Sequence, residues 1–441
     1  MSRRRKSPLP TEPVAVTIES LSHAGRGVVH INGKTVFIDG ALPGEEVTFL
    51  YQARHRRYDE GCVVEIINAS ADRTTPLCRH FERCGGCALQ HMSSEAQIAL
   101  KQQTLLDNLQ RIGKVMPEQI LEPLTGPIWG YRRKARLGVR FVIKKSTILV
   151  GFREKRSSFI TEIDSCPVLF PTIGNRISVL RELIAGMKAF DQIPQLEVAV
   201  GDNAISIIVR HLADLAAEDR DRLVEFGKHY DIHIYLQPEG VGSVYPLWPD
   251  KSELFYCLED YGIEMHFRPT DFTQVNADIN RRMVPWALGL LAVERSDRVL
   301  DLFSGIGNFS LPLARIAASV VGVEGDAGLV KRARDNASRN GIENVEFHVE
   351  DLAGESRGSN IMKQPFDKVL LDPPRTGAAE LISDVAGLGA KRVVYVSCNP
   401  ATLARDAGEL VNGYRYRLRS AGVMDMFPHT AHVEAIALFE R

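Results

Sequence analysis

The 441-residue chain is 44% hydrophobic and 25% charged, with a formal net charge of −1. This balance is ordinary for a folded, water-soluble protein, and the length predicts two to four domains. No apolar run approaches the ~20 residues that cross a bilayer. The opening "MSRRRKSPLP" has no hydrophobic stretch behind it, which argues against a secretory signal. We therefore expect a cytoplasmic protein without a membrane partner.

Basic residues are unevenly distributed along this nearly neutral chain. Residues 131–156 hold ten Lys or Arg against a single acid, Glu154. Two shorter basic clusters are "RRRK" at 3–6 and "ARHRR" at 53–57. One charged run is usually a solvated face. Three on a neutral chain favour a polyanionic partner, because phosphate contacts need concentrated positive charge. The distribution therefore predicts binding to nucleic acid.

Residues 14–68 have the pattern of short β-strands separated by turns. The five segments are "VAVTIESLS", "GRGVVHING", "KTVFIDG", "EEVTFLYQ" and "GCVVEIIN". Short strands with regular turns predict a small barrel of the OB type, which we place at 10–70. The stretch "GRGVVHINGKTVFIDGALPGEEV" resembles the TRAM domain, an OB-like RNA-binding module.

The middle of the chain, 75–265, mixes helices and strands. Residues 93–113 have apolar side chains at helical spacing, with Ser93 or Ser94 as the N-cap. The stretch 131–245 contains several predicted strands and two predicted helices, at 172–188 and 216–229. This pattern predicts an α+β central domain. The helix at 93–113 is a candidate to pack on the domain that follows.

The last part, 266–441, alternates helices with strands that are apolar throughout. Such strands belong to a doubly wound, mainly parallel sheet of the Rossmann-like type. The first of them runs into Gly305-Ile-Gly307 and then a helix, where a ligand can approach the backbone. The third glycine of a dinucleotide fingerprint (G-x-G-x-x-G) is missing, since "NFS" follows Gly307. A pyrophosphate loop is therefore disfavoured.

Acidic residues follow the next three strands of this region. Glu324 stands 17 residues after Gly307, where an acid can bind both hydroxyls of a ribose. Asp351 in "HVEDL" and Asp372 in "LLDPPR" follow two further strands. Ligands of open α/β sheets bind at the carboxyl ends of the strands, where all four segments lie. A short glycine loop followed by these acids is similar to the S-adenosylmethionine (SAM) methyltransferase pattern.

Cys398 ends the apolar run "KRVVYVS" and is followed by Asn-Pro. A buried cysteine is commonly inert, but one at the edge of a strand is placed for chemistry. Amino-group methyltransferases have an aromatic residue after Asp-Pro-Pro, and Arg375 stands there instead. A thiolate offers another route, because its addition to C6 of uracil makes C5 nucleophilic. A base must then remove the C5 proton, and Glu434 in "HVEAIALFE" is the candidate.

Four motifs, "FSGIGNFSLPLA", "LLDPPR", "YVSCNPATLARD" and "DMFPHTAHVE", closely resemble the RNA uracil-C5 methyltransferase family. The resemblance covers essentially the whole chain and implies Cys398 as nucleophile and Glu434 as general base. Two departures, Ser304 for Cys and Pro374 for Ala, concern side chains without a role in this chemistry. The resemblance also implies a set of SAM-binding residues, which is Gln274, Phe303, Asn308, Glu324, Asp351 and Asp372.

Three of the seven cysteines stand together, in "CRHFERCGGC". Cys78, Cys84 and Cys87 have the spacing C-x5-C-x2-C, and Cys166 is a distant fourth. Four thiolates suit zinc or an iron–sulfur cluster, and the spacing alone leaves both open. The radical-SAM spacing C-x3-C-x2-C is absent. The family resemblance implies a [4Fe–4S] cluster held by these four cysteines.

Within that family, a barrel, a cysteine cluster and this length together resemble the members that act on 23S ribosomal RNA. We expect a monomer that methylates C5 of one uridine in that RNA. The same chemistry on another ribosomal or transfer-RNA uridine is an alternative. So is a silent RNA-binding assembly factor, although such a protein needs neither Cys398 nor Glu434. An iron–sulfur redox protein is a third, less supported reading.

Overall fold

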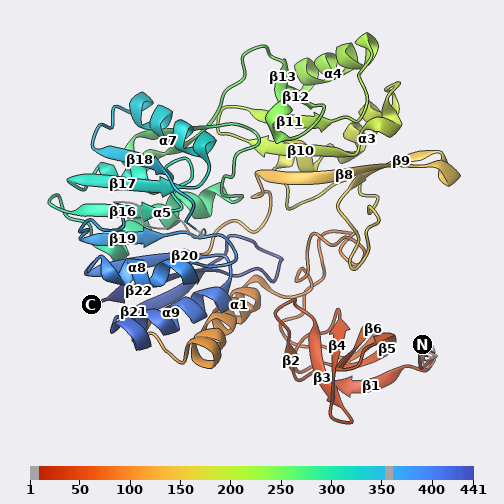
Figure 1. Ribbon diagram of the computed structural model, residues 1–441. Coiled ribbons are helices and arrows are strands. Elements are labelled where there is room, and N and C mark those ends of the chain that lie inside the picture. Colours follow the sequence, from red (N-terminus) through yellow and green to blue (C-terminus); the bar gives the residue numbers. More distant parts are fainter. Residues whose placement is uncertain (1–8, 353–360) are drawn as a thin grey trace, which may run out of the picture. The chain divides into compact units, whose positions relative to one another are not determined.

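The computed structural model of the protein describes residues 9–352 and 361–441 (Figure 1). The basic cluster at 3–6 lies outside the described residues. Two compact units are present. Unit 1 contains the chain up to Leu100, Glu154–Ser157 and Pro428–His432, and unit 2 contains Lys101–Arg153, Ser158–Phe427 and Val433–Arg441. Among the described residues, no helix has the length and apolar character to cross a membrane.

Unit 1 contains a six-stranded sheet in the order β1-β5-β6-β4-β3-β2. The first predicted segment forms both end strands, because its partner changes after Ile18: Ile18 donates its N–H to Glu45, next to β5, and Glu19 donates to Val28 of β3. The two ends of the sheet therefore meet and close a barrel around Ile38, Val47 and Phe49, which are fully buried. Its strands are β1 (Val14–Thr17), β2 (Ser20–Leu21), β3 (Gly27–Ile31), β4 (Lys34–Asp39), β5 (Glu46–Arg54) and β6 (Tyr58–Asn68).

The first sheet of unit 2 has the order β13-β12-β11-β10-β8-β9. Its β11 and β12 are parallel and are joined by α4 (Ala217–Tyr230), whereas the other neighbours are antiparallel. The strands are β8 (Lys134–Val142), β9 (Thr147–Gly151), β10 (Gln195–Val200), β11 (Ile205–Arg210), β12 (Ile232–Gln237) and β13 (Tyr245–Trp248). Helices α2 (Pro171–Gly174) and α3 (Ile177–Ala185) stand between β9 and β10 in the chain, and α3 contacts β9.

The second sheet of unit 2 has the order β18-β17-β16-β19-β20-β22-β21-β7. Five neighbouring strands, β18, β17, β16, β19 and β20, are mutually parallel, as the apolar runs predict. Strand β22 runs antiparallel to β20. The bounds are β7 (Gln119–Ile120), β16 (Arg298–Leu302), β17 (Ser319–Glu324), β18 (Val345–Val349), β19 (Lys368–Leu371), β20 (Arg392–Ser397), β21 (Arg417–Met424) and β22 (Glu434–Glu440). A separate hairpin, β14 (Leu254–Leu258) and β15 (Ile263–Phe267), lies between β13 and β16 in the chain.

Helices connect the parallel strands of this sheet (Figure 1). Side chains of Asp326 and Asn399 cap α7 and α9 by accepting the N–H groups of Leu329 and Ala401. Helix α7 therefore begins just after the carboxyl end of β17, and α9 begins just after that of β20. The helices are α5 (Ala277–Leu291), α6 (Ser310–Ala314), α7 (Ala327–Arg339), α8 (Ile382–Gly387) and α9 (Pro400–Tyr414).

The predicted helix at 93–113 is present as α1 (Ser94–Asn108) followed by a π-helical turn, η1 (Leu109–Gly113). Ser93 Oγ accepts the N–H of Ala96, as expected for the N-cap. Gly113 contacts α9 so closely that a Cβ there would lie 2.4 Å from the carbonyl oxygen of Ala404. The end of this helix therefore packs on α9. Short 3₁₀ turns elsewhere are η2 (Ile143–Lys145), η3 (Phe190–Gln192), η4 (Val241–Ser243), η5 (Glu259–Tyr261) and η6 (Ala379–Leu381).

Candidate active site

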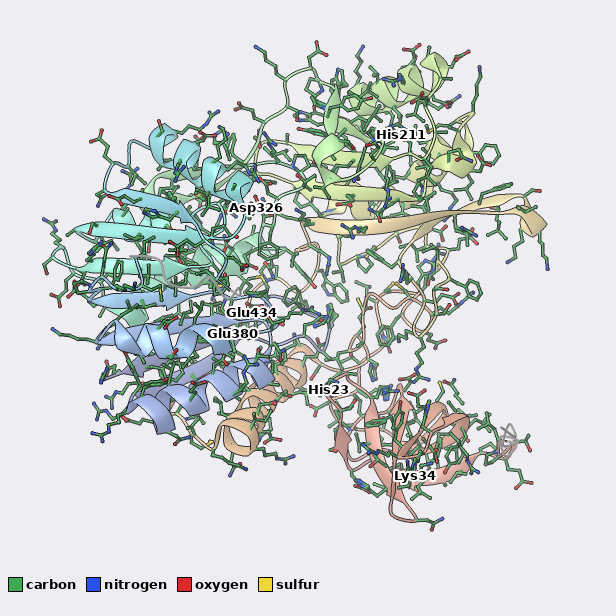
Figure 2. The ribbon with its side chains drawn as sticks, in the orientation of Figure 1. His23, Lys34, His211, Asp326, Glu380 and Glu434 are labelled. Atoms are coloured by element: carbon green, nitrogen blue, oxygen red, sulfur yellow. The ribbon has the colours of Figure 1, made fainter. Side chains whose placement is uncertain are left out.

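The carboxyl ends of five parallel strands lie along one edge of the second sheet of unit 2. The glycine loop follows β16, Glu324 ends β17, and Asp372 follows β19. Figure 2 shows Asp326, just after β17, and Glu434 at this same edge. The structure thus brings the predicted loops together, because parallel neighbours end side by side. Asp351 follows β18 in the same way and is exposed.

The glycine loop after β16 has a left-handed backbone at three positions. The φ angles are +66° at Phe303, +56° at Gly305 and +97° at Gly307. Positive φ is costly for a phenylalanine and free for glycine, so this turn is held by its surroundings. One of its supports is Glu324, whose Oε2 accepts the N–H of Gly305 at 3.0 Å.

Glu324 has a fixed carboxylate at the end of β17. Besides the bond to Gly305, its Oε1 accepts the N–H groups of Gly325 at 2.8 Å and Asp326 at 3.1 Å. The side chain is therefore tied to the glycine loop on one side and to the start of α7 on the other. A carboxylate held in this way is suited to accept hydrogen bonds from a ribose diol.

Asn308 belongs to a polar cluster beside this loop. Its side chain exchanges two hydrogen bonds with Asn280 of α5, at 3.0 and 2.9 Å. The hydroxyl of Tyr256 also donates to Asn308 Oδ1, at 2.9 Å. Gln274 lines a small cavity together with Asn280 and Tyr256. The structure therefore joins Gln274 and Asn308 through partners that the sequence did not single out.

Asp301 lies in β16 and is an acidic residue that the sequence analysis missed. It is fully buried, Ser310 Oγ donates to its Oδ2, and its Oδ1 has no hydrogen-bond partner among the described residues. Burial raises the pKa of Asp301 to about 7, the bond from Ser310 opposes this, and the carboxylates of Asp372 and Glu324 add to it. Burial also raises the pKa of Asp372 to about 7. The signal in the sequence was an acid inside an otherwise apolar run.

Cys398 and Glu434 come from neighbouring antiparallel strands. In the register of β20 and β22, Ser397 stands opposite Ala435, so the next pair along the strands is Cys398 and Glu434. The chain reverses direction between β20 and β22, which brings the beginning of β22 to the edge where β20 ends. The predicted nucleophile and base are therefore adjacent.

The electrostatic surroundings favour the neutral forms of both groups in the free protein. Burial raises the pKa of the Cys398 thiol, the carboxylates of Glu434 and Asp372 raise it further, and Arg375 opposes them. Glu434 is only 3% exposed, and burial holds its pKa well above the usual value, with Asp372 adding to the effect and Arg375 opposing it. Arg375 is thus the cation that favours the charged, reactive form of each group.

The three clustered cysteines lie in unit 1, and Cys166 lies in unit 2. None of the four is in a disulfide, and Gly86 donates its N–H to Cys84 Sγ at 3.5 Å. Amide donors of this kind are common around metal-bound sulfur, so the chemistry of these donors fits a metal. Over residues 9–352 and 361–441, however, no three His, Cys, Asp or Glu side chains are gathered as metal ligands. The four-cysteine set therefore stays a prediction.

The basic stretch 131–156 is only partly available to a polyanion. Arg133 pairs with Asp202, and Arg136 pairs with Glu197 at 3.0 Å. Lys134 is bonded to the carbonyl of Asp271, and burial lowers its pKa to about 8. Arg136 stays exposed in this pair, and the other exposed cations on β8 and the turn after it are Arg140, Lys144 and Lys145. The shorter stretch at 53–57 has three further exposed basic side chains, Arg54, Arg56 and Arg57.

Two family models match the chain. Residues 253–441 match the family described as tRNA (Uracil-5-)-methyltransferase, and residues 12–50 match the TRAM domain. The protein is therefore a multi-domain α/β protein with an N-terminal TRAM domain and a C-terminal class I SAM-dependent methyltransferase domain.

Solved structures support this fold. The chain is similar to the Pyrococcus abyssi tRNA (uracil-54, C5)-methyltransferase in complex with S-adenosyl-L-homocysteine, with a TM-score of 0.73. The two are 24% identical, and the match covers 97% of this chain and 100% of the other. At this identity, the likeness establishes the shared fold.

Relatives of known name match over nearly the full length. The chain is 52% identical over 443 residues to a 23S rRNA (uracil(1939)-C(5))-methyltransferase RlmD from Alcanivorax borkumensis, covering 100% of this chain and 99% of the relative. The RlmD of Methylococcus capsulatus is 53% identical over 440 residues, with the same coverage. Together with the paired Cys398 and Glu434 at the edge of a SAM-type sheet, this identity shows that the chain belongs to the RlmD family of 23S rRNA (uracil(1939)-C(5))-methyltransferases.

Proposed function

We propose that this protein transfers a methyl group from SAM to C5 of uridine 1939 in 23S ribosomal RNA. The observation that carries this proposal is the adjacency of Cys398 and Glu434 at the strand edge that also bears the glycine loop and Glu324. The sequence identity to RlmD proteins supports the choice of RNA and of nucleotide.

The chemistry follows from the two side chains. Cys398 gives up its proton to solvent, and its thiolate adds to C6 of the uracil, so that the C5–C6 π electrons become available at C5. SAM would supply the electrophilic methyl group to C5, with S-adenosylhomocysteine as the leaving group. Glu434, as a carboxylate, then removes the C5 proton. The electrons of that C–H bond re-form the C5–C6 double bond, and the Cys398 thiolate leaves.

The charges around the two groups assign a role to Arg375. Both Cys398 and Glu434 must ionise to react, although burial favours their neutral forms. The Arg375 guanidinium opposes that effect at both. We infer that Arg375 maintains the reactive thiolate and carboxylate once substrate has excluded water from the site.

The decisive experiment uses the purified protein, labelled SAM and unmodified 23S rRNA fragments that contain uridine 1939. We expect one methyl group per fragment, located at C5 of that uridine by nucleotide mapping. A fragment in which uridine 1939 is replaced by cytidine is the control and should stay unlabelled. Label at another uridine would keep the chemistry but overturn the target, and no label on any RNA would favour a silent binding protein.

SAM recognition should depend on pH. Because burial raises the pKa of Asp301 and Asp372 to about 7, both are mostly protonated at pH 6 and ionised at pH 8. We expect the affinity for SAM, which carries a sulfonium charge, to rise about tenfold over this range, since ionised acids attract it. S-adenosylhomocysteine lacks that charge and should gain less. Calorimetric titration of both compounds at the two pH values tests this, and equal gains would contradict it.

The cysteine set is proposed to hold a [4Fe–4S] cluster through Cys78, Cys84, Cys87 and Cys166, and no step of the reaction is assigned to it. Protein prepared without oxygen should be brown and carry about four irons. Cys84→Ala should lose most of the iron, whereas Cys257→Ala, which changes a thiol outside the set, should keep it. Metal analysis that finds stoichiometric zinc and no iron would refute the assignment.

A further inference from the structure

The segment after the nucleophile holds the loop that carries Arg375. Asn399 Nδ2 donates to the carbonyl oxygen of Arg375 at 2.9 Å, and a guanidinium nitrogen of Arg405 donates to that of Thr376 at 3.0 Å. These bonds join the residues next to Cys398 to the loop between β19 and η6. The backbone at Arg375 is therefore held by Asn399, the cap of α9, as well as by its connection to β19.

Asp406 is the buried centre of this connection. It is fully buried, and its Oδ2 accepts both the hydroxyl of Tyr395, at 2.7 Å, and the N–H of Ala378, at 2.8 Å. Its Oδ1 accepts Nε of Arg405 at 2.7 Å. One carboxylate thus joins β20, which ends beside Cys398, to the end of the Arg375 loop and to α9.

Gly377 shows how closely the loop approaches Asp406. Its φ is +78°, and a Cβ there would lie 2.7 Å from Asp406 Oδ2 and 2.6 Å from a guanidinium nitrogen of Arg405. A distance under 3.0 Å requires a shift of one partner. Any side chain at this position would therefore force either the loop or the Asp406 and Arg405 side chains to move, which disturbs the contact between them.

The electrostatics of the nucleophile depend on where this loop lies. The charged groups that act on Cys398 are the carboxylates of Glu434, on β22, and Asp372, after β19, and the guanidinium of Arg375. Only the last of these lowers the pKa of the thiol. Asp406 itself is not among them, so an effect of Asp406 on the thiol must pass through the loop.

We propose that Asp406 is a positioning residue for methyl transfer, which keeps the Arg375 guanidinium beside Cys398 by anchoring the loop after β19 to β20 and α9. This inference rests on the proposed function for its consequence in catalysis, but the effect on the thiol can be measured without RNA. A carboxylate in this place has a use that an amide cannot match. Three donors converge on it, and the NH₂ group of an asparagine would face at least one of them.

The test measures the ionisation of Cys398 in the full-length protein. The rate of alkylation by iodoacetamide is followed between pH 6 and 10 on the Cys398 peptide by mass spectrometry, so that the other six cysteines do not interfere. Asp406→Asn should raise the pKa of Cys398 and slow alkylation at pH 8 by about threefold to tenfold, because one pKa unit changes the thiolate population tenfold. Removal of a nearby negative charge alone would have the opposite sign.

Matched variants separate positioning from general damage. Arg375→Ala should give the same slowing, and Asp406→Asn should add nothing in that background, as expected for residues that act through one another. Leu410→Ala removes a fully buried side chain from the same helix and should leave the alkylation profile unchanged. Gly377→Ala disturbs the contact between the loop and Asp406 without changing an ionisable group. It replaces Asp406→Asn in the alkylation test if that variant does not fold.

The outcomes are distinguishable from those of the proposed function. If wild-type protein methylates the RNA while Asp406→Asn and Gly377→Ala both alkylate like wild type, the positioning role is wrong and the methyltransferase assignment stands. If the alkylation shift is present but wild-type protein labels no RNA, the positioning role stands and the methyltransferase assignment is wrong. A shift in Leu410→Ala equal to that in Asp406→Asn would also overturn the proposal, since it would reflect a loosened helix.

Discussion

Cys398→Ala is expected to abolish methylation while leaving the fold and SAM binding close to wild type. Without a thiolate, nothing adds to C6, and C5 of uracil is too weak a nucleophile to take the methyl group. Removal of an enzyme's nucleophile commonly lowers the rate by several orders of magnitude, and we expect a loss on the order of 10⁴-fold or more. SAM binding should persist, because β19 lies between β20 and the glycine loop of β16.

The measurement for Cys398 is transfer of labelled methyl groups to the 23S rRNA fragment, with SAM affinity measured in parallel. Cys257→Ala is the matched control, since Cys257 is a half-buried thiol on the β14–β15 hairpin. It should methylate at the wild-type rate. Activity of the Cys398 variant above a few per cent of wild type would exclude covalent addition by this residue.

Glu434→Gln is expected to stop the reaction at its last step. Addition of Cys398 and methyl transfer do not require a base at C5, so both should proceed. Release needs the electrons of the C5–H bond, and the amide cannot take that proton. The variant should therefore accumulate a covalent, already methylated protein–RNA adduct that survives denaturing electrophoresis. Turnover should fall by about 10²–10⁴-fold, the usual loss for a general base.

The structure makes this substitution mild for the fold. Glu434 is buried, and burial raises its pKa well above the usual value, which favours the neutral form. A glutamine matches that form in size and charge. Glu440→Gln, at the other end of β22, is the control and should turn over without an adduct. The double variant Cys398→Ala/Glu434→Gln should form no adduct. An inactive Glu434→Gln that binds RNA and SAM but traps nothing would show that Glu434 acts before release.

Much of the site could be predicted from sequence because the sheet is parallel. Apolar runs mark the strands, and the residue after each run must lie at one edge of the sheet. The closeness of Glu324 and Asp372 could therefore be predicted without knowing the conformation of the loops. Asp301 was missed because its own strand buries it. Asn280 and Tyr256 reach Asn308 only through tertiary packing, from 28 and 52 residues away, and no local pattern reports such contacts.

The barrel and the basic stretch show two other limits. Five strands were predicted in unit 1 and six are present, because one segment changes its partner after Ile18 and serves both ends of the sheet. The ten basic residues at 131–156 suggested a single surface, yet Arg133, Lys134 and Arg136 are engaged with acids or carbonyls. Charge counts do not reveal which cations are neutralised by acids distant in sequence. The domain boundaries and the cysteine set stay predictions.

The pairing of β20 with β22 gives the active site an unusual sensitivity to insertions and deletions. Cys398 and Glu434, the proposed nucleophile and base, are held opposite each other by the hydrogen bonds between β20 and β22, in which Ser397 faces Ala435. Neither residue is separated from its strand by a loop. Side chains alternate between the two faces of a sheet. A slip of one residue would therefore point Glu434 to the other face and place a neighbouring residue opposite Cys398. Substitutions that keep the buried interior of β22 apolar leave this register intact, but a change in the length of the strand does not. Evolution of this enzyme should therefore proceed by substitution in its last strand and by insertion elsewhere.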